Sequence, residues 1–321
     1  MQKIKVLVLL VLLASSTFAQ YNTKNLVIES QQTSSGFVFK NLALYPIHAK
    51  QSFVTAHKNV GKYLPLKKAI ENKKLKITEM ESGGTVNTLY AQNSSNDTVI
   101  ILGGEIVKGG KQDRMIAQDV LIPPGNKKIN LSVYCVEQHR WSSNDSRGNA
   151  SNSAPASFST SYNMSGTEVR KAALVNKNQS NVWQKVSETN TKNNTTNATG
   201  TYTAMDNNVG YKKDIDAYTA YFKKQFAMQS DVIGFIAVSG DKILGCDLFA
   251  TNALFTQQLD NLINSFATEA ITSGKKPAVA YNKIIAYYND FLADETKQDE
   301  KIKNNGTQLK IKQTKLHIAH Y

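Results

Sequence analysis

The chain has 321 residues, of which 41% are hydrophobic and 20% charged. This balance is ordinary for a globular protein of one large domain or two modest ones. The formal net charge of +13 favours anionic partners such as polyanions, acidic surfaces or phosphate ligands, although scattered lysines also serve solubility. The densest basic runs, Lys62–Lys76 and Lys301–Lys315, do not interleave aromatic residues with arginine, so nucleic acid is not an expected partner.

The first residues have the pattern of a secretory signal. Lys3 and Lys5 precede the apolar run Val6–Ala14, and Thr17–Ala19 is a plausible cleavage site. The run is shorter than the roughly 20 residues that span a bilayer, and no later segment reaches that length. We therefore expect residues 1–19 to be a signal peptide and the protein to be exported, either periplasmic or secreted, without a membrane span.

Residues 25–141 are predicted to be rich in short antiparallel strands, separated by turn signals such as Gly83-Gly84 and Asn93–Asp97. One short helix is expected over Leu64–Asn72, because Pro65 is tolerated in the first turn of a helix. The expected strands are 26–28, 37–47, 75–80, 86–92, 98–102, 105–108, 115–122 and 129–136.

The last two of these strands flank Pro123-Pro124-Gly125, so the sequence predicts that 115–122 and 129–136 pair as a hairpin. Alternate side chains of a strand point to the same face. If the second strand continues to residue 141, one face carries Cys135, Glu137, His139 and Trp141.

The second half of the chain is predicted to be rich in helices. Nine serines among the 24 residues 142–165 indicate a mobile loop, and the Thr- and Asn-rich segment 189–209 indicates a flexible one. Ser239-Gly240-Asp241 indicates a β-hairpin over 232–249. Helices are expected over 167–187, 214–228, 252–271 and 281–292, and a last strand over 309–319. The fold class is therefore α+β, with residues 20–321 as a single domain whose β-rich part is 25–141 and whose helix-rich part is 166–321.

Glu105 is the first candidate for chemistry, because it lies between Gly104 and the apolar pair Ile106-Val107. Burial of a carboxylate raises its pKa, which suits general acid–base catalysis. The alternative is that Glu105 points outward from its strand or pairs with Lys108 or Arg114.

Residues 109–114 form a glycine-rich turn that carries two cations, Lys111 and Arg114. Backbone N–H groups of such a turn can bind an anion. The spacing of the glycines approaches that of a P-loop, but Gly110 and Lys111 stand where that motif has Lys and Ser or Thr, so a nucleotide triphosphatase is rejected. Anion binding and a plain β-turn both remain open.

The heptad 135–141 is the chemically richest part of the chain. Cys135, Glu137 and His139 could ligate zinc or form a thiol nucleophile, although side chains two apart on a strand do not converge. The alternative is a polar rim in which Trp141 is a platform and Arg140 pairs with an acid, either Glu105 or Asp113.

Three further residues lie outside this stretch. Cys246 could pair with Cys135 in an oxidising compartment, or both could remain buried free thiols. His317 and His320 would not share a strand face, and we expect both on the surface.

Six blocks of the chain carry a resemblance to a family. They are NLALYPI, GEIVKGGKQDR, DVLIPPG, VYCVEQHRW, QSNVWQKV and VIGFIAVSGDKILGCDLFATNALFTQQLDNLINSFATEAI. Over about residues 25–271 the chain resembles the ARG and Rhodanese-Phosphatase-superfamily-associated protein domain. The family's name implies association with ADP-ribosylglycohydrolases and with rhodanese or phosphatase-like proteins, so the resemblance implies ADP-ribose or a related phosphorylated ligand. An exported chain would not meet such cytosolic partners.

Two functions follow from these residues. The first is a ligand-binding or interaction module with an anion-accepting site in Gly103–Trp141, whose partner is a small anionic ligand or an acidic surface. The alternative is a hydrolase with Glu105 or Glu137 as general base and His139 assisting, and a third interpretation is a structural salt-bridge network. The expected ligand-binding residues are Lys111, Gln112, Arg114, Gln138, Arg140 and Trp141. No metal or cofactor is expected, and the oligomeric state is not indicated.

Overall fold

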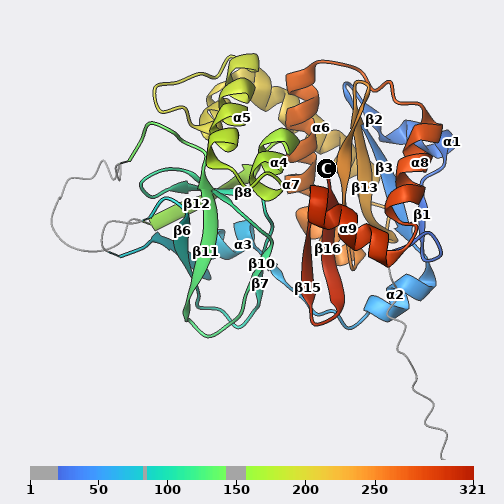
Figure 1. The fold of residues 1–321 in the computed structure, drawn as a ribbon, viewed down its shortest axis with the longest axis horizontal. Helices are drawn as coiled ribbons and strands as arrows, with labels where there is room; N and C mark the ends of the chain where they lie inside the picture. Colours follow the sequence, from blue (N-terminus) through green and yellow to red (C-terminus); the bar gives the residue numbers. More distant parts are fainter. Residues whose placement is uncertain (1–20, 82–84, 142–156) are drawn as a thin grey trace, which may run out of the picture.

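The computed structural model describes residues 21–81, 85–141 and 157–321, so the predicted signal peptide lies outside the described residues. A closed antiparallel barrel stands beside a seven-stranded sheet, with helices between them and on the outside (Figure 1). Strands dominate the N-terminal half, and helices and a β-hairpin follow in the C-terminal half. The predicted α+β class is confirmed.

The barrel has the strand order β11-β6-β5-β12-β8-β9. Its strands are β5 (Leu75–Glu79), β6 (Thr88–Asn93), β8 (Glu105–Gly109), β9 (Arg114–Ile116), β11 (Lys128–Cys135) and β12 (Ser157–Met164). Buried and more exposed residues alternate along β5 and β6, since one face of each strand lines the apolar interior. A small sheet of β4 (Leu64–Pro65), β7 (Val99–Ile101) and β10 (Val120–Ile122) packs on the same apolar cluster as the barrel interior.

The seven-stranded sheet combines strands from residues 26–49, 232–249 and 306–320, in the order β1-β3-β13-β14-β16-β15 with β2 paired to β3. Its strands are β1 (Leu26–Ile28), β2 (Val38–Phe39), β3 (Leu42–Ala49), β13 (Val232–Ser239), β14 (Lys242–Phe249), β15 (Gly306–Ile311) and β16 (Thr314–His320). All of its pairings are antiparallel. The predicted hairpin over 232–249 is confirmed as β13–β14, and every residue of β13 is buried because both faces of the sheet are covered.

The helices divide between the two faces of this sheet. The helical segments are α1 (Gln31–Ser34), η1 (Ser35–Phe37), α2 (Gln51–His57), α3 (Leu66–Glu71), α4 (Thr167–Leu174), α5 (Gln179–Lys192), η2 (Tyr202–Asn207), α6 (Val209–Phe226), α7 (Asn252–Ser273), α8 (Tyr281–Phe291) and α9 (Glu295–Asn305). One face shares an apolar cluster with α6 and α7, and the other shares a second cluster with α2, α8 and α9.

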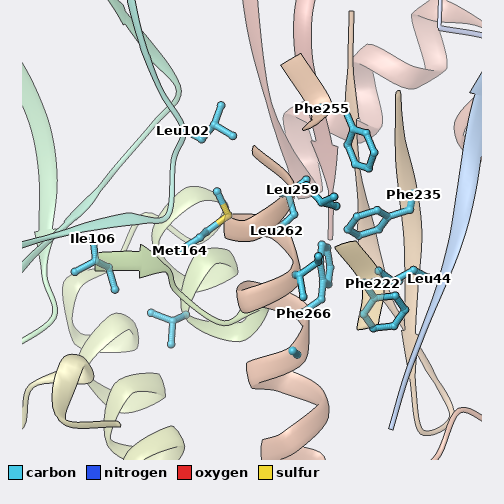
Figure 2. Packing of buried hydrophobic residues seen from close by; sticks show 14 of the residues in the cluster. Leu44, Leu102, Ile106, Met164, Phe222, Phe235, Phe255, Leu259, Leu262 and Phe266 are labelled. Atoms are coloured by element: carbon cyan, nitrogen blue, oxygen red, sulfur yellow. The ribbon is translucent and has the colours of Figure 1, made fainter. Parts of the chain in front are cut away.

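Helix α7 joins the barrel to the sheet. Thr251 caps its N-terminus by accepting a hydrogen bond from the Leu254 N–H, and the helix is followed by Gly274 in the left-handed conformation. Leu262 and Phe266 of α7 lie between barrel residues such as Ile106 and sheet residues such as Phe235 (Figure 2). Because α7 is packed on both sides, 13 of its residues are buried, more than one helical stripe alone would contribute.

The predicted hairpin of 115–122 with 129–136 is only partly correct. Residues 114–116 form β9, which pairs with β11 in the barrel, whereas residues 120–122 form β10, which pairs with β7 in the small sheet. The Pro-Pro-Gly segment therefore connects two sheets. Strand β11 also ends at Cys135, so the heptad that follows is not an extended strand with one chemical face.

The helix predicted over 167–187 is divided into α4 and α5. Lys177 adopts a left-handed conformation with φ 51°, and the side chain of Asn178 caps α5 by accepting from the Asn181 N–H. Gly166 occupies the N-cap position of α4, which has no side-chain cap.

Three segments of the second half differ from the structure predicted for them. In the predicted loop 142–165, residues 157–164 form β12, and residues 142–156 lie outside the described residues. In the predicted loop 189–209, α5 continues to Lys192 and η2 follows, because Asn side chains bond to backbone carbonyls there, as Asn190 does to Thr201. The predicted last strand is the hairpin β15–β16, and the polar helix α9 before it has only two buried residues.

Candidate functional site

The predicted functional stretch is divided between two clusters at opposite ends of β8. Glu105 begins β8 and Gly109 ends it. Because a strand rises about 3.3 Å per residue, the two positions lie roughly 13 Å apart. Glu105 therefore belongs to a cluster at the junction with the sheet, and the glycine turn belongs to one at the barrel end where β5, β8 and β11 finish.

At the barrel end, the backbone of the glycine turn already binds carboxylates of the protein itself. The N–H of Gly109 donates to Asp113 Oδ1 at 3.1 Å, that of Lys111 to Glu79 Oε1 at 2.8 Å, and that of Asp113 to Glu137 Oε2 at 3.0 Å. These three donors are satisfied without an added anion. Glu79 comes from the end of β5, and no local motif in the sequence marked it.

Arg140 contacts several groups of this cluster. Its Nε and Nη2 donate to the two oxygens of Glu137 at 2.9 and 2.6 Å, its Nη1 donates to the Gly110 carbonyl at 2.9 Å, and Asp113 lies 3.4 Å away. Of the two acids expected to pair with Arg140, Asp113 does so. Burial alone would raise the pKa of Glu137, but the hydrogen bonds from Arg140 and the Asp113 N–H outweigh burial and lower the pKa. Glu137 is thus a weak base with both oxygens occupied.

Arg114 is the largest fully buried charged side chain at this end. Its Nη1 donates to Gln112 Oε1 at 3.2 Å, and Nη2 lies 3.7 Å from Glu79 Oε1. Within the described part of the chain, Nε and Nη2 of Arg114 and Oε2 of Glu79 make no hydrogen bond. The ring of Trp141, 46% exposed, lies 5.5 Å from Arg114 Cζ and 5.2 Å from Lys111 Nζ.

The remaining residues of the heptad have different surroundings. The N–H groups of Gln138 and His139 donate to the Thr199 carbonyl, and both side chains are exposed. Burial raises the pKa of Cys135 to about 11, so its thiol is protonated and a poor nucleophile at neutral pH. Cys135 and Cys246 are both buried free thiols. Among the described residues, no three His, Cys, Asp or Glu side chains are placed to hold a metal ion.

At the junction, Glu105 is 1% exposed and faces α7. Its Oε2 accepts from the Leu102 N–H at 2.6 Å and its Oε1 from Asn261 Nδ2 at 2.8 Å. Burial raises the pKa of Glu105 to about 8, against the effect of these two hydrogen bonds. The alternatives in which Glu105 points outward or pairs with Lys108 or Arg114 are not seen, since Lys108 pairs with Asp206 and Arg114 with Glu79.

Beside Glu105 lies a chain of four charged groups with fully buried side chains, which we call the junction network. His317 on β16 contacts Asp119 at 2.6 Å and Asp247 on β14 at 3.1 Å, and Arg170 on α4 binds Asp247 at 2.7 and 3.2 Å. The expectation that His317 is a surface residue is wrong. His320 is half-buried and contacts the Tyr287 hydroxyl at 2.8 Å.

We expect Glu105 to lower the free energy of unfolding as the pH rises from about 5 to about 8, because the folded protein retains the Glu105 proton that the unfolded chain releases. His320, whose pKa burial lowers from 6.5 to about 4, acts in the opposite direction below 6.5. The folded pKa of Glu105 is about 8 against an ordinary 4.5, so its contribution is complete below 4.5 and is lost as the pH rises through 8. The slope reaches about 1.4 kcal/mol per pH unit. Urea denaturation at successive pH values measures it, and Glu105→Gln removes that part of the slope. An identical slope in the variant contradicts the assignment.

One surface groove lies away from both clusters. It encloses about 800 Å³ between the end of α6 and the start of α7, and its walls include Phe226, Met228 and Leu259. A second groove of about 710 Å³ lies beside the β15–β16 turn.

The structure is that of an α+β protein in which helix α7 packs between an antiparallel barrel and a sheet whose strands come from distant parts of the sequence. Paired charges are buried at both ends of the barrel. The chain belongs to the ARG and Rhodanese-Phosphatase-superfamily-associated Protein domain family, whose model matches residues 30–320. The match confirms the resemblance and extends it to the last strands. No curated protein and no solved structure matches the chain. Of the helices that the structure describes, none is long and apolar enough to cross a membrane.

Proposed function

We propose that the protein is an exported ligand-binding module that accepts a small anionic ligand at the barrel end, beside Arg114, Lys111 and Trp141. The observation that carries the proposal is the buried guanidinium of Arg114, whose Nε and Nη2 have no hydrogen-bond acceptor among the described residues. A buried donor without an acceptor is costly, and guanidinium groups match the oxygens of carboxylates and phosphates.

Three further points support this location. The mouths of β-barrels are common ligand sites, and Trp141 offers a half-exposed ring at this one. Lys111 and Arg114, on which the sequence prediction rested, both lie close to that ring. The glycine turn itself binds the protein's own carboxylates, so the ligand contacts side chains rather than the backbone of the turn.

An anionic ligand has to compete with acids of the protein itself for the cations of this cluster. Glu79, Asp113 and Glu137 already balance Lys111, Arg114 and Arg140, so an anion would compete with Glu79 for Arg114, which Glu79 approaches only to 3.7 Å. The family name makes ADP-ribose or a simpler phosphate the first compounds to test, and the basic n-region and apolar run of residues 1–19 support export.

We expect inorganic phosphate or ADP-ribose to raise the unfolding temperature of the protein, since a ligand at about 100 times its Kd adds about 2.7 kcal/mol. Lys111→Ala and Trp141→Ala should reduce the shift. Lys127→Ala is the matched control, because it removes one exposed lysine next to the start of β11, outside the cluster, and should preserve the shift. Scanning calorimetry with acidic glycans and divalent cations in parallel tests selectivity. No shift with any compound, or an equal shift in all variants, contradicts the proposal.

A second candidate function is hydrolysis with Glu105 as general acid or base. The pKa of about 8 favours Glu105 over Glu137, whose pKa is lowered. Glu105 lies roughly 13 Å from the barrel end along β8, so this activity needs a substrate at the junction and not at Arg114. If Glu105→Gln abolishes hydrolysis but leaves the ligand-induced rise of the unfolding temperature unchanged, the hydrolytic site and the ligand-binding site are different sites.

A further inference from the structure

We propose that His317 is a proton-operated lock between the barrel and the seven-stranded sheet, closed while the imidazole carries two protons and released when it loses one. The lock is independent of ligand binding at the barrel end. It consists of the junction network, Asp119, His317, Asp247 and Arg170, whose side chains are all fully buried.

The geometry of the ring requires the second proton. Nδ1 of His317 lies 2.6 Å from Asp119 Oδ2, and Nε2 lies 3.1 Å from Asp247 Oδ1. A neutral imidazole has one donor and one acceptor, whereas an ionised carboxylate only accepts. Only the imidazolium can donate to both acids. A neutral ring would set a nitrogen lone pair against a buried carboxylate oxygen.

The two acids belong to different parts of the fold, so the ring joins those parts. Asp119 lies between β9 and β10, and its other oxygen accepts from the Gly103 N–H at 2.7 Å, two residues before β8. Asp247 lies on β14 of the sheet and is held by Arg170 of α4. His317 on β16 is the residue that contacts both acids.

The groups around His317 fix the direction of its titration. Asp119 and Asp247 face its two nitrogens, Phe249 stacks on the ring with centroids 4.5 Å apart, and Arg170 lies beyond Asp247. At neutral pH Glu105 beside them is protonated, so two cations balance two anions; above about pH 8 Glu105 also ionises, and its negative charge further favours the His317 proton. Loss of the His317 proton leaves one negative charge without compensation in a fully buried site.

The pKa of His317 agrees with this geometry. Burial alone would lower it, but Asp119 and Asp247 outweigh burial and raise it from 6.5 to about 9. A histidine whose folded pKa is raised stabilises the fold fully below its unfolded pKa. That contribution is lost as the pH rises through the folded pKa. The lock is therefore closed at neutral pH and releases near pH 9.

NMR of the full chain labelled with ¹⁵N-histidine tests the protonation directly. We expect both ring nitrogens of His317 to carry protons at pH 7.5 and to titrate near pH 9. Asp119→Asn should lower this midpoint by about one unit or more, because an amide can donate to a neutral ring and still accept from the Gly103 N–H. A His317 midpoint near 6.5 in the wild-type protein, or an unmoved midpoint in Asp119→Asn, would overturn the proposal.

Amide hydrogen exchange tests the release. We compare amide exchange rates after dividing each by the intrinsic rate at the same pH. From pH 7 to pH 10 we expect this corrected rate to increase at least about tenfold more for Gly103 than for Ala91 inside the barrel. In His317→Gln this difference should already be present at pH 7. His48→Gln is the matched control, because His48 also contacts two carboxylates, Glu29 and Asp231, but at the surface of the sheet. Equal acceleration at Gly103 and Ala91 would mean that no local lock opens, and would refute the inference.

Discussion

Replacement of Arg170 by alanine is expected to lower the free energy of unfolding by about 3–5 kcal/mol, because it leaves Asp247 charged and fully buried without its cation. Arg170 is completely buried and binds both oxygens of Asp247, and its guanidinium lies 4.8 Å from the ring of Tyr321. Arg170 and His317 together hold the pKa of Asp247 near 2, although burial alone would raise it. Urea unfolding followed by circular dichroism measures the loss.

The control for this variant is Lys223→Ala. Lys223 and Asp260 also form an ion pair, at 2.9 Å, but both side chains are about half exposed. Exposed pairs contribute about 0–1 kcal/mol, so this variant should be almost neutral. If Arg170→Ala costs no more than Lys223→Ala, the junction network does not hold the fold together.

Glu137→Ala is expected to cost a comparable amount, about 3–5 kcal/mol, because it removes the carboxylate that pairs with Arg140 and that accepts from the Asp113 N–H. Both side chains of the pair are largely buried, at 4% and 12% exposed. The loss should appear in chemical denaturation whether or not a ligand is present. This outcome would assign Glu137 to the structure of the barrel end and not to catalysis.

A double-mutant cycle with Arg140→Ala isolates the pair. The double variant should lose about 1–3 kcal/mol less free energy of unfolding than the sum of the two single variants, since the second substitution removes a residue whose partner is already missing. Glu188→Ala, which breaks the more exposed pair with Lys185, should cost less than about 1 kcal/mol. Additive losses in the cycle would show that Glu137 and Arg140 act independently.

Local signals in the sequence were sufficient for much of the fold. The turn Ser239-Gly240-Asp241 predicts the hairpin β13–β14, because a turn depends on residues a few positions apart. The stretch 115–122 failed because its two short strands belong to different sheets, which the apolar pattern does not encode. Serine-rich β12 failed because composition alone indicated a loop.

The candidate site shows the same limit. The sequence left open whether Glu105 is buried, and the structure shows that it is. The predicted pairing of Arg140 with an acid, either Glu105 or Asp113, is seen with Asp113. The partners that decide the chemistry come from distant positions: Glu79 lies 32 residues from Lys111, and Asp119 lies 198 residues from His317. Such pairs leave no periodic or spacing signal, so a lone histidine near the end of the chain was assigned to the surface.

The mixed origin of the seven-stranded sheet affects the order in which the chain can fold during synthesis. Strand β3 is synthesised early, but its neighbour β13 is synthesised only after all barrel strands and α4–α6. Strand β14 cannot pair with β16 until the end of the chain has been synthesised. The barrel strands are nearer neighbours in sequence and can pair first. A ribosome-bound chain would therefore carry a formed barrel whose α7-facing wall, with Leu102 and Ile106, is still uncovered. Such an intermediate exposes apolar surface and suits capture by a chaperone until release of the complete chain.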